Sequence, residues 1–137
     1  MEKAVFSFCN YYFTKAKIEF LEQPENDYRV NFIPKGEFCK EDSMFKLNLG
    51  VIVSSHKDDL ETNIIEIECY AEFKFSEKKN LCDIPDFFFP NSIAIIFPYI
   101  RAFISTLSLQ ANRCPVILPT MNLTSLQEEL KNNTIEK

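Results

Sequence analysis

The sequence predicts an α+β fold in which a four-stranded antiparallel sheet precedes a long helix, an apolar connector and a short C-terminal helix. Apolar and polar residues alternate through the first half of the chain, the period of two that strands with one buried face show. After residue 91 the apolar residues change to helical spacing. The length of 137 residues suits one core, so we expect a single domain over residues 1–137.

Four strands are expected, over about residues 4–21, 28–33, 44–55 and 62–76. The fourth shows the pattern clearly, because Ile65 and Ile67 alternate with Glu66 and Glu68. The first is apolar or aromatic on both sides over residues 5–13, so both of its faces should be covered there. Short connections join the strands, and parallel pairing needs a longer crossover, so we expect successive strands to be antiparallel neighbours.

Two helices are expected, over about residues 92–112 and 123–132, with Asn91 or Ser92 as the cap of the first. The first helix is apolar nearly all round and therefore has to be buried on two sides. The sheet can cover one side, and a second copy of the helix is the best candidate for the other. The predicted subunit interface therefore consists of Tyr11, Phe13, Tyr99, Arg101 and Phe103.

The apolar run over residues 93–109 also invites comparison with a membrane span. It falls short of the ~20 residues that a span needs, and it contains Pro98 and Arg101. We therefore expect a buried helix and no membrane insertion. Two roles remain open for Arg101: a side chain that reaches solvent from the helix edge, or a specific bond across the subunit interface.

Charge and cysteine content exclude several classes of protein. The net charge is −5, and the 15 Lys and Arg are scattered among 20 Asp and Glu, whereas nucleic-acid binding needs clustered basic residues. The five cysteines are odd in number and widely spaced, which fits reduced thiols better than a disulfide framework or a zinc site. The first residues lack the pattern of a signal peptide, so we expect a cytoplasmic protein.

Residues typical of catalysis or cofactor binding do not cluster. His56 is the single histidine and falls in an expected hairpin, and Gly36 and Gly50 stand too far apart to form a phosphate-binding loop. Glu66 and Glu68 share one side of a strand, where a solvated sheet face is favoured over acid–base chemistry. We therefore expect no enzyme: no catalytic residue, no cofactor and no metal site.

Two segments near the end of the chain carry a family resemblance. Residues 97–101 read Phe-Pro-Tyr-Ile-Arg, and residues 114–122 read Cys-Pro-Val-Ile-Leu-Pro-Thr-Met-Asn. Together they resemble the signature of the SecB-like protein-export chaperones. The resemblance implies a homotetramer, built as a dimer of dimers with the long helices at the interface. It also implies a chaperone that binds unfolded preproteins in apolar grooves, without nucleotide, and passes them to the translocation ATPase SecA.

The chain departs from this family in two places. The connection over residues 22–27 is shorter than the family's aromatic crossover loop, and Lys15 and Lys17 occupy a region where the family docks the translocase through acidic residues. A SecB-like chaperone for another client, such as the antitoxin of a toxin–antitoxin system, therefore stays open. A small oligomeric ligand-binding module of the helix-on-sheet type is the third possibility.

The expected binding groove for non-native polypeptides combines the second strand, the connector and the last helix. Its apolar residues exceed what a small core needs from its final helix, although they could also simply dock that helix on its own subunit. The predicted peptide-binding residues are Tyr28, Phe32, Val116, Leu118, Met121, Leu123, Leu126 and Leu130.

Overall fold

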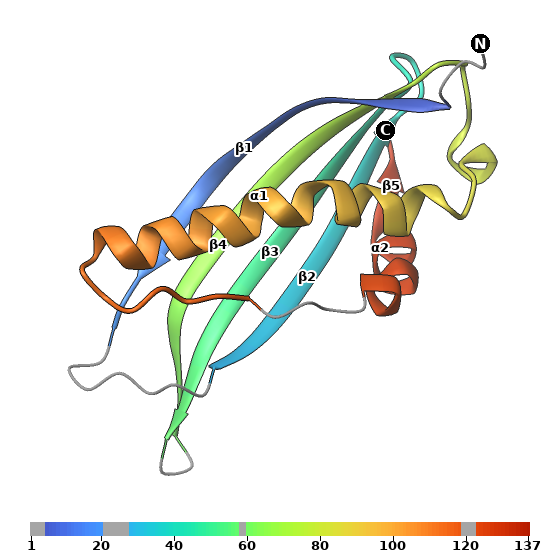
Figure 1. Ribbon diagram of the computed structural model, residues 1–137. Helices are drawn as coiled ribbons and strands as arrows, with labels where there is room; N and C mark the ends of the chain where they lie inside the picture. The colour runs from blue at the N-terminus through green and yellow to red at the C-terminus, as the bar shows by residue number, and fades with distance from the viewer. Residues whose placement is uncertain (1–4, 21–27, 58–59, 119–122) are drawn as a thin grey trace.

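The computed structural model describes residues 5–20, 28–57, 60–118 and 123–137. Within these residues a five-stranded sheet is crossed on one face by one long helix (Figure 1). The strands are β1 (Phe6–Ile18), β2 (Tyr28–Cys39), β3 (Met44–Lys57), β4 (Leu60–Phe75) and β5 (Thr134–Glu136). They follow the order β1-β4-β3-β2-β5, and only the β2–β5 pair is parallel. The predicted α+β class is confirmed, with a mixed sheet in place of a purely antiparallel one.

The position of β1 contradicts the expectation that successive strands are neighbours. β1 pairs with β4 and forms one edge of the sheet, so β4 and β3 both lie between it and β2. The connection over residues 19–27 can reach about 30 Å, whereas three strand spacings need only about 15 Å. A short connection therefore allows β1 and β2 to be separated, and the argument from connection length was wrong.

β2 is longer than the sequence predicted, and a further strand, β5, pairs with its second half. β2 continues through Pro34 to Cys39, beyond the predicted end at residue 33. Proline is tolerated there because β5 pairs only with residues 36–38, so Pro34 has an open edge beside it. Residues 134–136, after the last predicted element, form β5, and the Lys137 amide donates to the Phe38 carbonyl at 2.8 Å.

The helices begin at other residues than predicted. Helix α1 spans Phe88–Gln110, with Phe87 as its N-terminal cap residue, so Asn91 and Ser92 do not cap it. Pro90 falls in the first turn, where its missing N–H has no helical partner to lose. The expected last helix divides into a 3₁₀ turn, η2 (Leu123–Leu126), and α2 (Gln127–Asn132). A further 3₁₀ turn, η1 (Leu81–Asp83), follows β4.

The core lies between the sheet and the side of α1 that faces it. Phe88, at the start of α1, packs edge-on against Phe6 of β1 at 4.9 Å between ring centroids and against Phe45 of β3 at 4.8 Å. Isoleucines one turn apart, including Ile93, Ile96, Ile100 and Ile104, are buried along the same side. Aromatic rings and branched side chains thus hold α1 in place. Figure 1 shows the helix crossing the strands.

Helix α1 is also long and apolar enough, by length and composition alone, to cross a membrane. At 23 residues it exceeds the apolar run on which the sequence argument against a span relied, so that length argument was wrong. Burial explains the apolar residues on its sheet-facing side, whereas the apolar residues on its other side are uncovered in the single chain.

Candidate functional site

A group of aromatic side chains lines the side of the molecule where β1 runs beneath α1. Tyr11 stacks on Tyr99 with ring centroids 4.3 Å apart, and Phe13 stacks on Phe103 at 4.0 Å. Phe8 joins the group through Tyr11 and Tyr99, each at 6.0 Å. We call these five residues the aromatic edge. Tyr11 and Tyr99 remain exposed, whereas Phe8, Phe13 and Phe103 are partly buried against the core.

The structure therefore brings together four of the five residues predicted as a subunit interface: Tyr11, Phe13, Tyr99 and Phe103. The fifth, Arg101, is exposed on α1, outside this cluster. The expectation that both faces of the first strand are covered does not hold within one chain, because Val5 and Tyr11 are exposed. β1 is also an edge strand, and an open edge offers unpaired backbone groups to a further strand.

The outward side of α1 is the second uncovered apolar surface. Ala94, Pro98 and Ala102 are exposed there at spacings of four residues, and Leu109 continues the surface at the end of the helix. Small residues in such a row let a second helix approach closely. We call this surface, residues 94, 98, 102 and 109, the outer face of α1.

The connector after α1 is held to the helix by two serine side chains. Ser108 accepts a hydrogen bond from the Val116 amide at 2.9 Å, and Ser105 donates one to the Val116 carbonyl at 3.0 Å. Because the connector is extended, its side chains alternate, with Val116 and Leu118 buried and Ile117 63% exposed. Sequence reasoning missed both serines; their spacing of three residues within an apolar helix was the signal available.

The predicted peptide-binding residues do not form one exposed groove. Phe32, Val116, Leu118 and Leu130 are buried in the core, so the structure contradicts their placement on a groove surface. Two interpretations were given for the apolar residues of the last helix: a client-binding surface, or docking of the helix on its own subunit. The burial of Leu130 supports docking. Of the other predicted positions, Tyr28 and Leu126 are half-buried, whereas Met121 and the side chain of Leu123 lie outside the described residues.

Tyr28 lies near the start of the connector. Burial is the main reason that the pKa of its hydroxyl is raised, with a further contribution from Cys114 and an opposing one from Arg113. Arg113 in turn places its guanidinium 5.4 Å from the centre of the Phe20 ring. Tyr28 therefore borders the connector as predicted, as one half-buried ring and not as part of a continuous groove.

The sheet face away from α1 carries charges that pair across strands. Lys15 of β1 lies 3.1 Å from Glu66 of β4, and the hydrogen bond from Lys15 is the main cause that lowers the Glu66 pKa. On the same face Lys46 sits over the rings of Tyr12, at 5.6 Å, and Tyr70, at 5.2 Å. A hydrogen bond with Tyr12 is the main cause that raises the Lys46 pKa. These pairs are typical of a solvated sheet face, which is the interpretation favoured from the sequence.

The cysteines are unpaired, and one of them is buried. All five are free thiols, and burial raises the pKa of Cys69 to about 12, so this thiol stays protonated at neutral pH. Among the residues that the structure describes, no three His, Cys, Asp or Glu side chains come together as a metal site would require.

Comparisons with known proteins agree with this architecture. No family model matches the chain. The solved structure of the SecB-like chaperone Rv1957 of Mycobacterium tuberculosis, in complex with a peptide from the HigA1 antitoxin, superposes with a TM-score of 0.72. The superposition covers 85% of this chain and 91% of that one at 13% identity, which shows a shared fold. A protein of unknown function from Streptococcus agalactiae gives a TM-score of only 0.42, and we draw nothing from it.

A relative by sequence is the uncharacterized protein MJ0357 of Methanocaldococcus jannaschii. It is 30% identical over 144 residues, which span 98% of this chain and 92% of the relative. Identity at this level across nearly the whole of both sequences shows that the chain belongs to the family of MJ0357, and its fold is that of the SecB-like chaperones.

Proposed function

We propose that the protein is a chaperone that binds extended apolar segments of non-native polypeptides without nucleotide. The observation that carries this proposal is the pattern of the connector, where the buried side chains of Val116 and Leu118 flank the exposed Ile117. Weak contacts of this kind suit a chaperone, because many of them along one flexible client add up while folded proteins present no such segment.

The fold supports a polypeptide as ligand. The solved SecB-like chaperone Rv1957 holds a peptide from an antitoxin, so this architecture can bind a peptide. For the present chain the exposed apolar residues around the connector, with Tyr28 and Leu126 at its borders, are the proposed contact surface. Val116, Leu118, Phe32 and Leu130 support that surface from the core.

Two kinds of client fit the proposal. The first is a range of preproteins kept competent for export and passed to the ATPase SecA in the cytoplasm. The second is a single dedicated client such as an antitoxin, which is the kind of peptide that Rv1957 holds. Lys15 and Lys17 stand where the SecB family carries acidic docking residues, and Lys15 pairs with Glu66, which favours the second client over transfer to SecA.

We further propose that the protein works as a homotetramer, a dimer of dimers. Within the described residues, the aromatic edge and the outer face of α1 are two apolar surfaces that the single chain leaves uncovered, and a dimer of dimers needs two different interfaces. Burying them would remove Tyr11, Tyr99 and the row of small residues on α1 from water.

The proposed function is tested by mixing the purified protein with a slowly refolding, aggregation-prone enzyme diluted from denaturant. We expect light scattering by the aggregating enzyme to be suppressed at near-stoichiometric ratios without ATP. Suppression of several unrelated clients would support the general export role. If no client is protected, general chaperone activity is excluded, and binding of a single peptide in a library screen becomes the test of the dedicated role.

A further inference from the structure

The short strand β5 is held to the sheet mainly through its backbone. It consists of only three residues, Thr134–Glu136, and runs parallel to the last part of β2. The Asn133 carbonyl accepts a hydrogen bond from the Gly36 amide at 3.2 Å, and the Lys137 amide donates one to the Phe38 carbonyl at 2.8 Å. Bonds of this kind depend on an extended backbone and not on particular side chains.

The side chains of β5 are poorly packed. Ile135 is 59% exposed, and Glu136 is exposed as well. A hollow of about 260 Å³ borders Ile135 on the sheet face away from α1, and another of about 400 Å³ borders Glu136 beside the start of α1. The buried apolar anchor of the C-terminal segment is Leu130, which precedes β5. Segments with few buried apolar contacts open locally at a lower free energy than the whole domain.

The remaining attachments are stronger before β5 than at its end. The Thr134 hydroxyl donates to the Leu130 carbonyl at 2.6 Å, and the Asn133 side chain donates to the Pro34 carbonyl at 3.3 Å. At the end of the chain, Lys137 forms an ion pair with a glutamate of β2 at 2.6 Å, but the two side chains are 64% and 36% exposed. Exposed ion pairs stabilise little, because water and salt screen them. Residues 135–137 can therefore leave while residues 133 and 134 stay attached.

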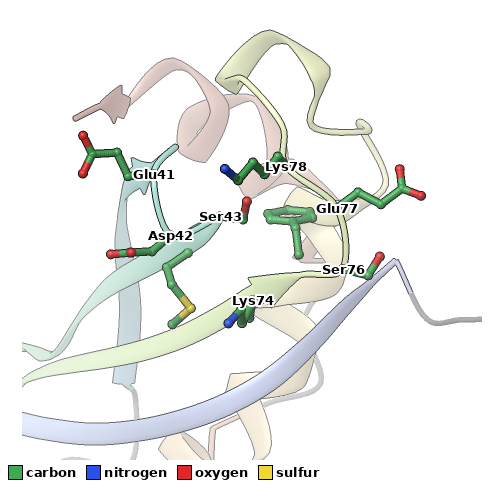
Figure 2. Close-up of a pocket in the computed structure, with 9 residues that line it drawn as sticks. Glu41, Asp42, Ser43, Lys74, Ser76, Glu77 and Lys78 are labelled. Atoms are coloured by element: carbon green, nitrogen blue, oxygen red, sulfur yellow. The ribbon is translucent and has the colours of Figure 1, made fainter.

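β2 is fixed independently of β5. Every residue of β2 pairs with β3, and the turn that follows is anchored by the Ser43 carbonyl, which accepts a bond from the Phe75 amide at 2.9 Å. Figure 2 shows this turn, beside a cavity of about 540 Å³ lined by residues 41–44 and 74–78. Detachment of β5 would leave β2 in place as a strand edge with free backbone N–H and C=O groups.

We propose that β5 is a displaceable strand, and that an extended segment of a non-native polypeptide takes its place beside β2. The inference rests on the chaperone function proposed above and gives the same client a second contact. β5 itself shows which occupant this edge accepts, an extended backbone parallel to β2. Strand addition recognises main-chain groups that every polypeptide carries, which suits clients without a common sequence. The exchange replaces one set of backbone hydrogen bonds by an equal set, so only the few side-chain contacts of β5 are lost.

The first test is hydrogen exchange measured by NMR on the full chain. The N–H and C=O groups of Phe38 face β5, whereas Leu47 lies on the central strand β3. We expect the Phe38 amide to exchange at least about a hundredfold faster than the Leu47 amide, at a rate that changes little with low urea, as local opening does. If both amides exchange at one rate that rises with urea, β5 leaves only on global unfolding and the proposal is overturned.

The second test compares two substitutions on β5. Ile135→Pro removes the amide that faces the Gly36 carbonyl in the parallel register, so β5 should detach. Binding of a labelled peptide of alternating Leu and Ser, measured by fluorescence anisotropy, should then tighten by about three- to tenfold, because β5 no longer competes for the edge. Ile135→Ala keeps the amide and should bind as the wild type does. Equal affinity of the two variants would overturn the proposal.

The wild-type complex with the same peptide gives a direct readout. At saturation the amides of Ile135 and Glu136 should move to the chemical shifts of an unstructured chain, while the Phe38 amide becomes more protected from exchange. If β5 keeps its shifts in the saturated complex, the inference is overturned and the chaperone function stands, because the peptide is then bound elsewhere. If the peptide binds neither the wild type nor Ile135→Pro, the inference and the binding of extended apolar segments both fail.

Discussion

Ile117 illustrates how single residues acquire their roles in this protein. Val116, Ile117 and Leu118 are similar apolar residues in sequence, and Val116 and Leu118 were predicted to line the binding groove. Two hydrogen bonds orient the connector: the Ser105 hydroxyl donates to the Val116 carbonyl, and the Ser108 hydroxyl accepts from the Val116 amide. As a result its first and third side chains are buried and only the middle one faces solvent. The sequence shows that the connector is apolar, but it does not show which of its side chains are buried and which are exposed.

Ile117→Glu should weaken client binding without unfolding the protein. The side chain is exposed, so its replacement should change the free energy of unfolding by less than about 0.5 kcal/mol. A charge in the apolar contact surface should weaken binding of an unfolded peptide by about tenfold. The measurement is fluorescence anisotropy of a labelled apolar peptide, beside the aggregation assay.

The matched control for this prediction is Ile135→Glu. Ile135 is 59% exposed, close to the 63% of Ile117, but it lies on β5 at the far edge of the sheet. Its replacement should leave peptide binding unchanged. Equal binding by the two variants would mean that the connector is not the contact surface.

Among the elements, the pairing of β5 with β2 depends on a close approach that only glycine allows. A Cβ atom on Gly36 would clash with the ring of Phe45 and would lie 2.6 Å from the Thr134 side-chain oxygen. Thr134 is anchored there because its hydroxyl donates to the Leu130 carbonyl at 2.6 Å. Gly36 therefore lets the C-terminal segment lie against the core while Phe45 stays buried.

Gly36→Ala should destabilise the fold by about 1–3 kcal/mol and lower the melting temperature by about 5–10 °C, because the added methyl group overpacks this contact. Gly50→Ala is the matched control. There the added atom would meet Ile33 at an ordinary 3.5 Å, so stability should be unchanged or slightly higher. Thermal unfolding followed by circular dichroism measures both, and equal melting temperatures would contradict the packing argument.

At the scale of the whole molecule, the aromatic edge and the outer face of α1 lie on the same side, on and beside α1. The aromatic edge runs along β1 below the helix, and the outer face of α1 points away from the sheet. The sheet covers the other side of the helix. The distribution of exposed apolar residues therefore favours assembly on this side of the molecule, whereas the opposite sheet face carries paired charges such as Lys15–Glu66.

Ala102→Glu should dissociate the proposed tetramer while leaving each chain folded. Ala102 is exposed in the single chain, so the charge costs little there, but at a helix–helix interface an unpaired buried charge costs several kcal/mol. Light scattering coupled to size-exclusion chromatography should then show the mass fall toward that of a dimer or of the 16.0 kDa chain.

For assembly, Ile135→Glu again serves as the control and should keep the mass of the wild type. A wild-type mass of one chain at micromolar concentration would exclude the tetramer outright.

Arg101→Ala, also on the exposed part of α1, distinguishes the two roles left open for that residue. Loss of assembly indicates a specific bond across the interface, and unchanged assembly indicates a side chain that only reaches solvent.

The sequence by itself determined the class of fold, the four long strands and the long helix, because burial on one face imposes a period on the residues within each element. Ile65 and Ile67 alternate and Ile93, Ile96 and Ile100 follow helical spacing whatever lies opposite them. Four residues of the aromatic edge could also be predicted, because a strand and a helix that are apolar on two sides each need a second surface to cover them.

Only the tertiary structure decided which strands are neighbours, which connector side chains face the core and where β5 lies. Each depends on contacts between residues far apart in the chain, such as β1 with β4, Ser108 with Val116, and Gly36 with Thr134. Periodicity reports that a residue is buried and not what it is buried against. For that reason the predicted groove of Val116, Leu118 and Leu130 proved to be core.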